Sequence, residues 1–268
     1  MQFSFPEFSG ATRRLILWNL TAFFVLLLAN VAKVVSPQAV LAHIGLNPPY
    51  FMVGELWQPF TYSLVHFSVL GTAFELLSLW FLAGFLESMH ASRWITGLYI
   101  CSVLGSAVVA ILIYGIGLGT GHPQPLIAIT GCMGGIFGLL TAIGVLHGDV
   151  EFQMFFVLGI KAKYLAIVYA LIAIAQTFGE QRIYAFAQLG GGLAAVLYVR
   201  FATRRGLSLG ISEGFYGLRN KYYRWKRRRA ASKFQVYMKK QGRTVKFDGQ
   251  GRLIDEDDVK HDDRKRWN

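Results

Sequence analysis

The chain has 268 residues, of which 54% are hydrophobic and only 16% are charged, and its formal net charge is +12. A soluble domain of this length usually carries about 25% charged residues, so much of this surface faces something other than water. The two cysteines, Cys101 and Cys132, both lie in apolar runs and give no sign of a disulfide framework. An ordinary water-soluble domain and a disulfide-stapled secreted domain are therefore both excluded.

A helix that crosses the hydrocarbon core of a bilayer needs about 20 predominantly apolar residues. The first apolar run has no cleavage site of the usual small-residue form, so we expect a retained span and not a removed signal peptide. The apolar segment 150–162 is too short to span and is expected at the membrane interface. In all, the sequence predicts six spans, near 14–35, 64–87, 94–117, 126–147, 163–179 and 183–201.

The basic residues between the predicted spans indicate an orientation. Loops on the cytoplasmic side of membrane proteins carry an excess of Lys and Arg. If the N-terminus is cytoplasmic, the basic residues before the first span, between the second and third spans and between the fourth and fifth spans all fall on one side, together with the C-terminal tail. We therefore expect an integral, multi-pass protein of a bacterial inner membrane, with both termini in the cytoplasm. The basic residues concerned are Arg13, Arg14, Arg93, Lys161 and Lys163.

The net charge is concentrated in the tail. Residues 1–199 hold seven basic and seven acidic residues, so the whole net charge of +12 belongs to 200–268. The sequence predicts two domains, a membrane domain at 1–201 and a tail at 202–268. In the tail, 213–240 is a candidate basic helix that also carries aromatic residues. The Asp-Gly at 248–249 indicates a small hairpin, and the highly charged end from 255 is expected to be disordered.

Three stretches resemble the rhomboid family of intramembrane serine proteases. Residues 55–68 read ELWQPFTYSLVHFS and lead into FELLSLWFLAGFLE at 74–87, similar to the first loop and second helix of that family. Residues 131–140 read GCMGGIFGLL, similar to its Gly-X-Ser-Gly segment on the fourth helix. Residues 187–195 read AQLGGGLAA, similar to the sixth helix that carries the catalytic His. The resemblance implies an all-α membrane protein, a rhomboid-like bundle of six transmembrane helices with a basic cytoplasmic tail.

The resemblance also implies that the catalytic groups are missing. Rhomboid proteases use a Ser nucleophile activated by a His, and a nucleophilic Ser needs such a base within hydrogen-bond reach. In this chain the Ser position is Met133 and the His position is Gln188, while the two oxyanion-holding positions on the second helix fall on Gly71 and Glu75. A thioether has no proton to lose and a carboxamide is not a usable base, so the family implies a pseudoprotease. Of the family's further features His66 remains, whereas its Trp-Arg pair is Trp57-Gln58 here.

What remains of the family pattern is helix packing. Small residues four apart let helices approach closely inside a membrane. The fourth and sixth predicted spans carry such pairs, and they are expected to pack against each other. The pairs are Gly131/Gly135, Gly134/Gly138, Gly190/Ala194 and Gly191/Ala195.

The polar residues at membrane depth are candidates for a client-binding cavity: Glu75, Gln188, His66 and Met133. A charge in an apolar span is expensive and is often functional. Glu75 has an equally open structural interpretation, as a protonated carboxyl bonded to Gln188 or to a backbone carbonyl. We expect Glu75 and Gln188 to contact each other, directly or through water, across one cavity whose floor is closed by Met133. His66 is expected to bond loop backbone. Cys132 lies about 100° from the Ser position on a helix and has no neighbouring His, so we do not expect it to replace the Ser nucleophile.

No metal site or cofactor is predicted, because the histidines show no ligand spacing such as His-x-x-x-His. The basic tail could indicate nucleic acid, but a basic and aromatic segment beside a membrane is better explained by anionic lipid headgroups. No nucleic-acid partner is therefore expected. The residues assigned to the membrane surface are Lys221, Arg224, Lys226, Arg227, Arg228 and Arg229.

Three functions stay open at this point. The first is a non-catalytic binder of transmembrane client or partner segments. The second is an intramembrane endopeptidase of the rhomboid type that uses relocated groups. The third is a membrane anchor that acts through its tail.

Overall fold

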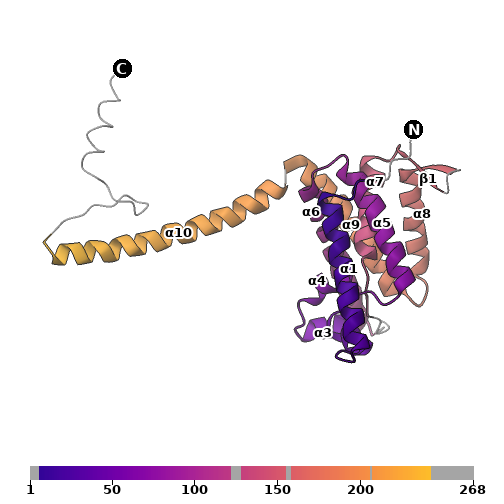
Figure 1. The fold of residues 1–268 in the computed structure, drawn as a ribbon, viewed down its shortest axis with the longest axis horizontal. Helices are drawn as coiled ribbons and strands as arrows, with labels where there is room; N and C mark the ends of the chain where they lie inside the picture. The colour runs from indigo at the N-terminus through magenta and orange to yellow at the C-terminus, as the bar shows by residue number, and fades with distance from the viewer. Residues whose placement is uncertain (1–5, 122–127, 155–157, 206, 243–268) are drawn as a thin grey trace, which may run out of the picture. The chain divides into compact units, whose positions relative to one another are not determined.

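The computed structural model describes residues 6–121, 128–154, 158–205 and 207–242. Contacts divide the chain into two units, Met1–Arg204 and Arg205–Asn268, which are described separately here. The first is a bundle in which the long helices lie side by side (Figure 1). The elements in chain order are α1 (Gly10–Val31), α2 (Pro37–His43), α3 (Pro48–Val53), α4 (Gln58–Thr61), the 3-10 helix η1 (Tyr62–Leu64), α5 (Val69–Glu87), α6 (Ser92–Gly119), α7 (Met133–Leu146), β1 (Glu151–Met154), β2 (Leu158–Lys161), α8 (Ala162–Gln176), α9 (Arg182–Arg205) and α10 (Leu207–Lys240).

Among the described residues, four helices are long and apolar enough to cross a membrane, namely α1, α5, α6 and the Arg182–Phe201 part of α9. The other two apolar helices are shorter, since α7 has 14 residues and α8 has 15. At about 1.5 Å per residue they are roughly 21 to 23 Å long, less than the thickness of the hydrocarbon core. Each of the six predicted spans thus corresponds to an apolar helix, and four of these helices have the length of a span.

The start of α7 differs from the prediction, which placed a span from residue 126. The helix begins only at Met133, because the chain before it is extended and pairs with the first loop. Leu46 and Ile129 exchange backbone hydrogen bonds of 2.9 Å in an isolated antiparallel bridge. Irregular backbone of this kind is tolerated at membrane depth only where protein or a cavity surrounds it.

The segment 150–162, predicted to lie at the interface, forms the antiparallel hairpin β1–β2, in which Glu151 pairs with Lys161 and Met154 with Leu158. The chain is therefore not entirely α-helical. Lys163 donates a 2.7 Å hydrogen bond to Asp149 at the base of the hairpin, and this contact lowers the pKa of the Asp149 carboxyl. The hairpin that the sequence predicts after Gly242, and the end from 255, lie outside the described residues.

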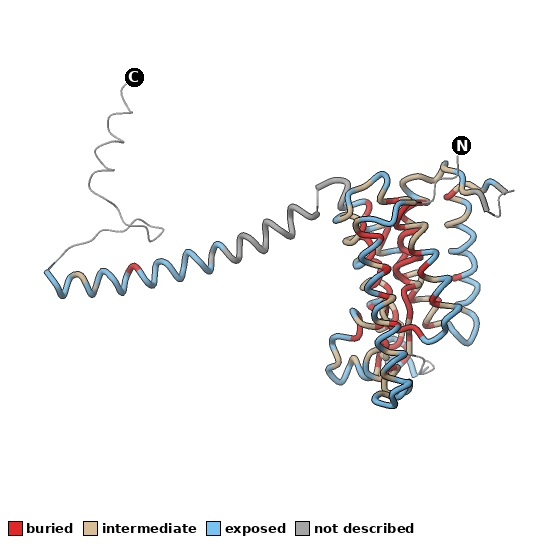
Figure 2. The backbone as a smooth tube through the Cα atoms, viewed as in Figure 1, coloured by how far each residue is buried: buried red, intermediate tan, exposed pale blue. Residues whose placement is uncertain are grey.

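The core of the bundle is organised around α7, which packs against α5, α6 and α8. Buried residues run along the inside of the bundle, as Figure 2 shows. A helix that is apolar on all sides must be surrounded, and nine residues of α7 are buried. By contrast, α1 and α8 leave many large apolar side chains exposed, which suits contact with lipid tails.

The small residues of α7 and α9 lie where the helices approach most closely. A Cβ atom added to Gly191 would collide with the carbonyl oxygen of Gly134, so α7 and α9 are in direct backbone contact there. Gly190 and Ala194 instead face Gly105 on α6, and Gly135 and Gly138 also face α6, at Tyr99 and Ser102. The small residues of α9 therefore pack against two helices, α6 and α7, whereas the sequence predicted packing against the fourth span alone.

The carboxylate of Glu87 joins three helices at one end of the bundle. It accepts hydrogen bonds from the backbone N–H of Ala11 (2.6 Å) and of Thr12 (2.9 Å), from the Thr12 hydroxyl (2.6 Å) and from the Ser92 hydroxyl. Because the first amides of a helix have no partner within the helix, Glu87 at the end of α5 caps α1 and ties it to the start of α6.

We predict that Glu87→Gln destabilises the protein by about 1 kcal/mol, the usual cost of losing a helix N-cap. The amide retains one acceptor oxygen but loses the charge that favours the positive end of α1. Thermal unfolding of the purified protein in detergent measures the loss. Glu7→Gln, at an exposed carboxylate nearby, is the matched control and should be neutral. Equal unfolding temperatures for Glu87→Gln and the parent would contradict this assignment.

Candidate functional site

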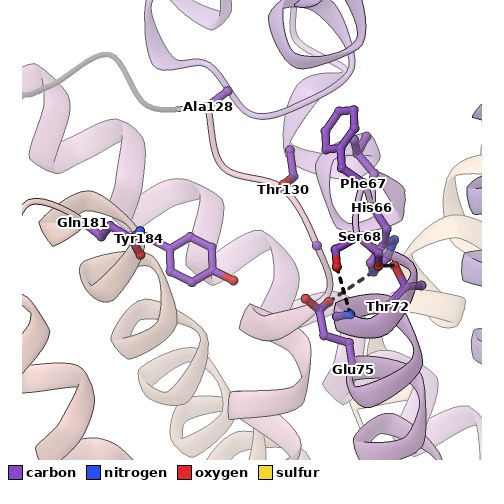
Figure 3. Close-up of a pocket in the computed structure, with 12 residues that line it drawn as sticks. His66, Phe67, Ser68, Thr72, Glu75, Ala128, Thr130, Gln181 and Tyr184 are labelled. Carbon is purple, nitrogen blue, oxygen red and sulfur yellow. Dashed lines mark hydrogen bonds and ion pairs between the residues drawn. The ribbon is translucent and has the colours of Figure 1, made fainter. Parts of the chain in front are cut away.

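A cavity of about 330 Å³ lies between the start of α5, the extended segment before α7 and the start of α9. Figure 3 shows His66, Ser68, Thr72 and Glu75 on one side of it, with Gln181 and Tyr184 on the other. The Tyr184 hydroxyl points across the cavity toward the Glu75 carboxylate (Figure 3). The cavity is thus lined by polar groups on opposite walls, in a part of the chain that is otherwise apolar.

Glu75 is the centre of the polar contacts. Its Oε2 atom lies 3.2 Å from His66 Nε2, 3.0 Å from the backbone nitrogen of Cys132 and 3.3 Å from Cys132 Sγ. These partners come from the loop after η1 and from the residue that precedes α7. One carboxylate oxygen therefore connects three segments that are up to 66 residues apart in the sequence.

The position of Glu75 explains how a carboxylate is kept in an apolar span. Cys132 is the N-cap residue of α7, so its backbone N–H lies at the positive end of that helix. A helix N-terminus is a favourable place for an anion, because the dipole and the free N–H groups both point at it. His66 adds a second polar partner, and its side chain is only 2% exposed.

His66 is held from both ring nitrogens. Its Nδ1 lies 3.2 Å from the carbonyl oxygen of Leu64, the loop-backbone contact that the sequence predicted. Its Nε2 faces Glu75. The sequence did not predict this second contact, because nothing in the spacing of residues 66 and 75 reveals that the loop folds back on α5.

The predicted direct contact between Glu75 and Gln188 is not formed. Both residues belong to the described part of the chain, and the hydrogen bonds of Glu75 go to His66 and Cys132. Gln188 interacts with Tyr184, one helical turn before it on α9. Tyr184 is closer to the start of α9 and takes the place on the cavity wall that the sequence assigned to Gln188.

Met133 also departs from its predicted place. It is the first residue of α7 and packs, partly buried, against the apolar core, whereas the cavity lining includes Gly131 and Thr130. The reason is that Cys132 and Met133 point in different directions from the start of α7, and Cys132 takes the side of Glu75. Gly71 does line the cavity, one turn before Glu75, as expected.

Cys132 joins the polar contacts around Glu75, an association that the sequence did not predict. Its side chain is completely buried, and its sulfur contacts the Glu75 carboxylate and not a histidine. The Glu75 carboxylate contacts both the Cys132 thiol and the His66 imidazole. The imidazole therefore does not contact the thiol directly, as the base of a cysteine protease does.

The loop before the cavity is ordered by Gln58, whose side chain is fully buried. Its side-chain nitrogen donates to the backbone carbonyl of Ala42 (2.9 Å) and to the Glu55 carboxylate (2.7 Å). Its side-chain oxygen accepts from the backbone N–H of Asn47 (2.9 Å). These bonds hold the segment between α2 and η1, which leads into the loop that carries His66.

In the second unit, the basic residues assigned to the membrane surface lie on α10. The side chains of Arg224, Lys226, Arg227, Arg228 and Arg229 are exposed, and that of Lys221 lies outside the described set. Arg229 lies over the ring of Trp225, with 5.2 Å from its guanidinium carbon to the ring centroid. This helix exposes both aromatic rings and cations to its surroundings.

We predict that Gly131→Ala destabilises the protein strongly and weakens the polar cluster. Gly131 has φ +88°, which an L residue rarely adopts, and its added Cβ would lie 2.9 Å from a Glu75 carboxylate oxygen. Thermal unfolding measures the loss. Gly54→Ala is the control for backbone strain alone, since Gly54 has φ +121° with open space around it. A loss at Gly131 no larger than at Gly54 would mean that contact with Glu75 adds nothing.

Comparison with known proteins identifies the fold. No curated protein matches the chain. The sequence model of the Rhomboid domain matches residues 53–205, a range that contains the cavity and all of α5 to α9. With apolar helices of spanning length in the same range, the chain is an integral, multi-pass membrane protein. It belongs to the rhomboid family.

Proposed function

We propose that this protein is a catalytically inactive member of the rhomboid family, which binds transmembrane segments of client or partner proteins in the membrane. The observation that supports the proposal is the replacement of both catalytic residues of the family. Met133 stands at the position of the nucleophilic Ser, and Gln188 stands at that of the His. In the structure His66, which lines the cavity, contacts Glu75 through its Nε2 atom.

A cavity that binds a transmembrane segment without cleaving it needs polar groups at membrane depth but no nucleophile. Glu75, His66 and Tyr184 supply hydrogen-bonding groups on two walls of the cavity, while the Cys132 thiol beside it is buried. An unpaired polar group in hydrocarbon costs several kcal/mol, so a client segment with a polar or kinked backbone at this depth gains by entering.

The proposal includes a topology of six spans with both termini in the cytoplasm of a bacterial cell. It is supported by the basic residues of the connecting loops and by the six apolar helices. The two short helices, α7 and α8, would cross only part of the core, as helices surrounded by protein can.

A second candidate, a peptidase with relocated groups, is favoured by one observation, the meeting of Cys132, Glu75 and His66. Two facts weigh against it: the thiol is fully buried, and a carboxylate stands between it and the imidazole.

We predict that the purified protein does not cleave a generic rhomboid substrate in detergent or in liposomes. A thioether at position 133 has no proton to give up, and the Gln188 carboxamide at the position of the family's His is not a usable base. The assay measures product by mass spectrometry, with an active rhomboid protease as the positive control. Turnover above background that disappears in Cys132→Ala would replace the binding proposal with the peptidase. Turnover that survives this variant would equally refute an inactive site.

We predict that a photo-crosslinking amino acid at Gln181 captures transmembrane segments in native membranes, because Gln181 lines the cavity. The same amino acid at Phe178, which lies in the same loop and is 89% exposed, is the matched control. Filling the cavity with Gly71→Leu should remove the adducts of position 181 and leave those of position 178. Identical adducts from both positions, unaffected by Gly71→Leu, would show that the cavity binds no client.

We propose further that the tail binds the anionic membrane surface, and we predict that a peptide of residues 213–240 binds vesicles containing anionic lipid. Each Lys or Arg near such a surface contributes about 1 kcal/mol, and salt screens the attraction. Vesicle co-sedimentation at increasing salt measures it, with Gln in place of the five residues Arg224 and Lys226–Arg229 as the control. Equal binding to neutral vesicles, or tighter binding to nucleic acid, would contradict the assignment.

A further inference from the structure

His66, Glu75 and Cys132 bring an imidazole, a carboxylate and a thiol together beside the cavity. Their ligand atoms all lie within 4.8 Å of one another. The three residues come from the loop after η1, from α5 and from the N-cap of α7. We propose that this cluster is a binding site for a divalent transition-metal ion, with Zn²⁺ as the best match. The proposal is independent of whether the cavity also binds clients.

The distances fit such an ion. In a tetrahedral site with Zn–N and Zn–O near 2.0 Å and Zn–S near 2.3 Å, ligand atoms lie about 3.3 to 3.6 Å apart. Glu75 Oε2 lies 3.2 Å from His66 Nε2 and 3.3 Å from Cys132 Sγ, so these two pairs already have coordination spacing. Only the imidazole and the thiol must move closer, by a side-chain adjustment.

The proton on His66 gives an independent reason to expect a cation. A carbonyl oxygen can only accept, so Nδ1 must carry a proton toward the oxygen of Leu64, 3.2 Å away. In neutral His66 the lone pair then belongs to Nε2, which faces a carboxylate oxygen at 3.2 Å. Two lone pairs at this distance repel unless a proton or a metal ion lies between them. A backbone carbonyl on the second nitrogen is also the usual way in which a metal-binding His is oriented.

The charges of the cluster balance with a dication. Binding releases the thiol proton, so that Cys132–SH and M²⁺ give the metal thiolate and H⁺. One thiolate, one carboxylate, one neutral imidazole and M²⁺ sum to zero, which suits a site removed from water. Sulfur and imidazole ligands favour Zn²⁺ over Mg²⁺ or Ca²⁺. The adjacent cavity of about 330 Å³ leaves room for water as a fourth ligand.

The test uses the full-length protein in detergent, stripped with a chelator and titrated with Co²⁺, whose spectrum reports on its ligands. We expect one equivalent to bind with a thiolate-to-cobalt charge-transfer band and to be displaced by Zn²⁺. Cys132→Ser should lose the band, and His66→Ala and Glu75→Gln should weaken binding by about ten- to a hundredfold. The matched controls are Cys101→Ser and His43→Ala, where His43 faces Glu55 at 2.7 Å on the exposed surface. Both should bind like the parent.

The result that overturns the proposal is a Cys101→Ser protein, with Cys132 as its only thiol, that shows no charge-transfer band under saturating Co²⁺. A band that persists in Cys132→Ser overturns it as well. If Cys132→Ser does not fold, the Cys101→Ser protein decides alone, because its spectrum can contain a thiolate band only from Cys132. Substrate cleavage plays no part in this readout, so its outcome is separate from that of the proposed function.

Discussion

The structure of the membrane unit depends on a carboxylate placed at the start of its central helix. Glu75 faces the backbone N–H of Cys132, at the positive end of α7. This contact fixes where α7 begins, and it draws in the loop that carries His66. The helix cannot begin earlier, because Gly131 turns the chain with φ +88° directly against the same carboxylate. The cavity lies beside this contact, and its lining includes Glu75, His66 and Gly131.

A glutamate of α5 binds the N-terminus of a neighbouring helix at two places along α5. Glu75, near its start, lies at the N-terminus of α7, while Glu87, at its end, caps α1. Each carboxylate occupies free helix amides that would otherwise be costly to leave in a medium without water. A single helix thereby sets the positions of two neighbours, and the small residues of α9 close the bundle against α6 and α7.

The apolar helices could be predicted from the sequence to within a few residues, because length and hydropathy decide them. The late start of α7 could not, since it depends on the pairing of Leu46 with Ile129, 83 residues apart. The cavity residues His66, Glu75 and Gly71 could be named from the family pattern. A direct contact between Glu75 and Gln188 is not formed, because motif positions fix the helix but not which turn of it reaches the cavity, where Tyr184 lies instead. Cys132 was set aside and a metal site was not expected, since the three residues share no sequence spacing and only the folded loop brings them together.

Glu75 and His66 act as one interacting pair that holds the loop to the start of α7. A double-mutant cycle tests it most directly, with unfolding free energies for the parent, His66→Ala, Glu75→Gln and the double variant. For two residues in contact at a shared network, the account predicts a coupling energy of about 1 to 3 kcal/mol, with the double variant less destabilised than the sum of the single variants. Losses that add to within about 0.5 kcal/mol would show that the two side chains are independent, and would contradict the account.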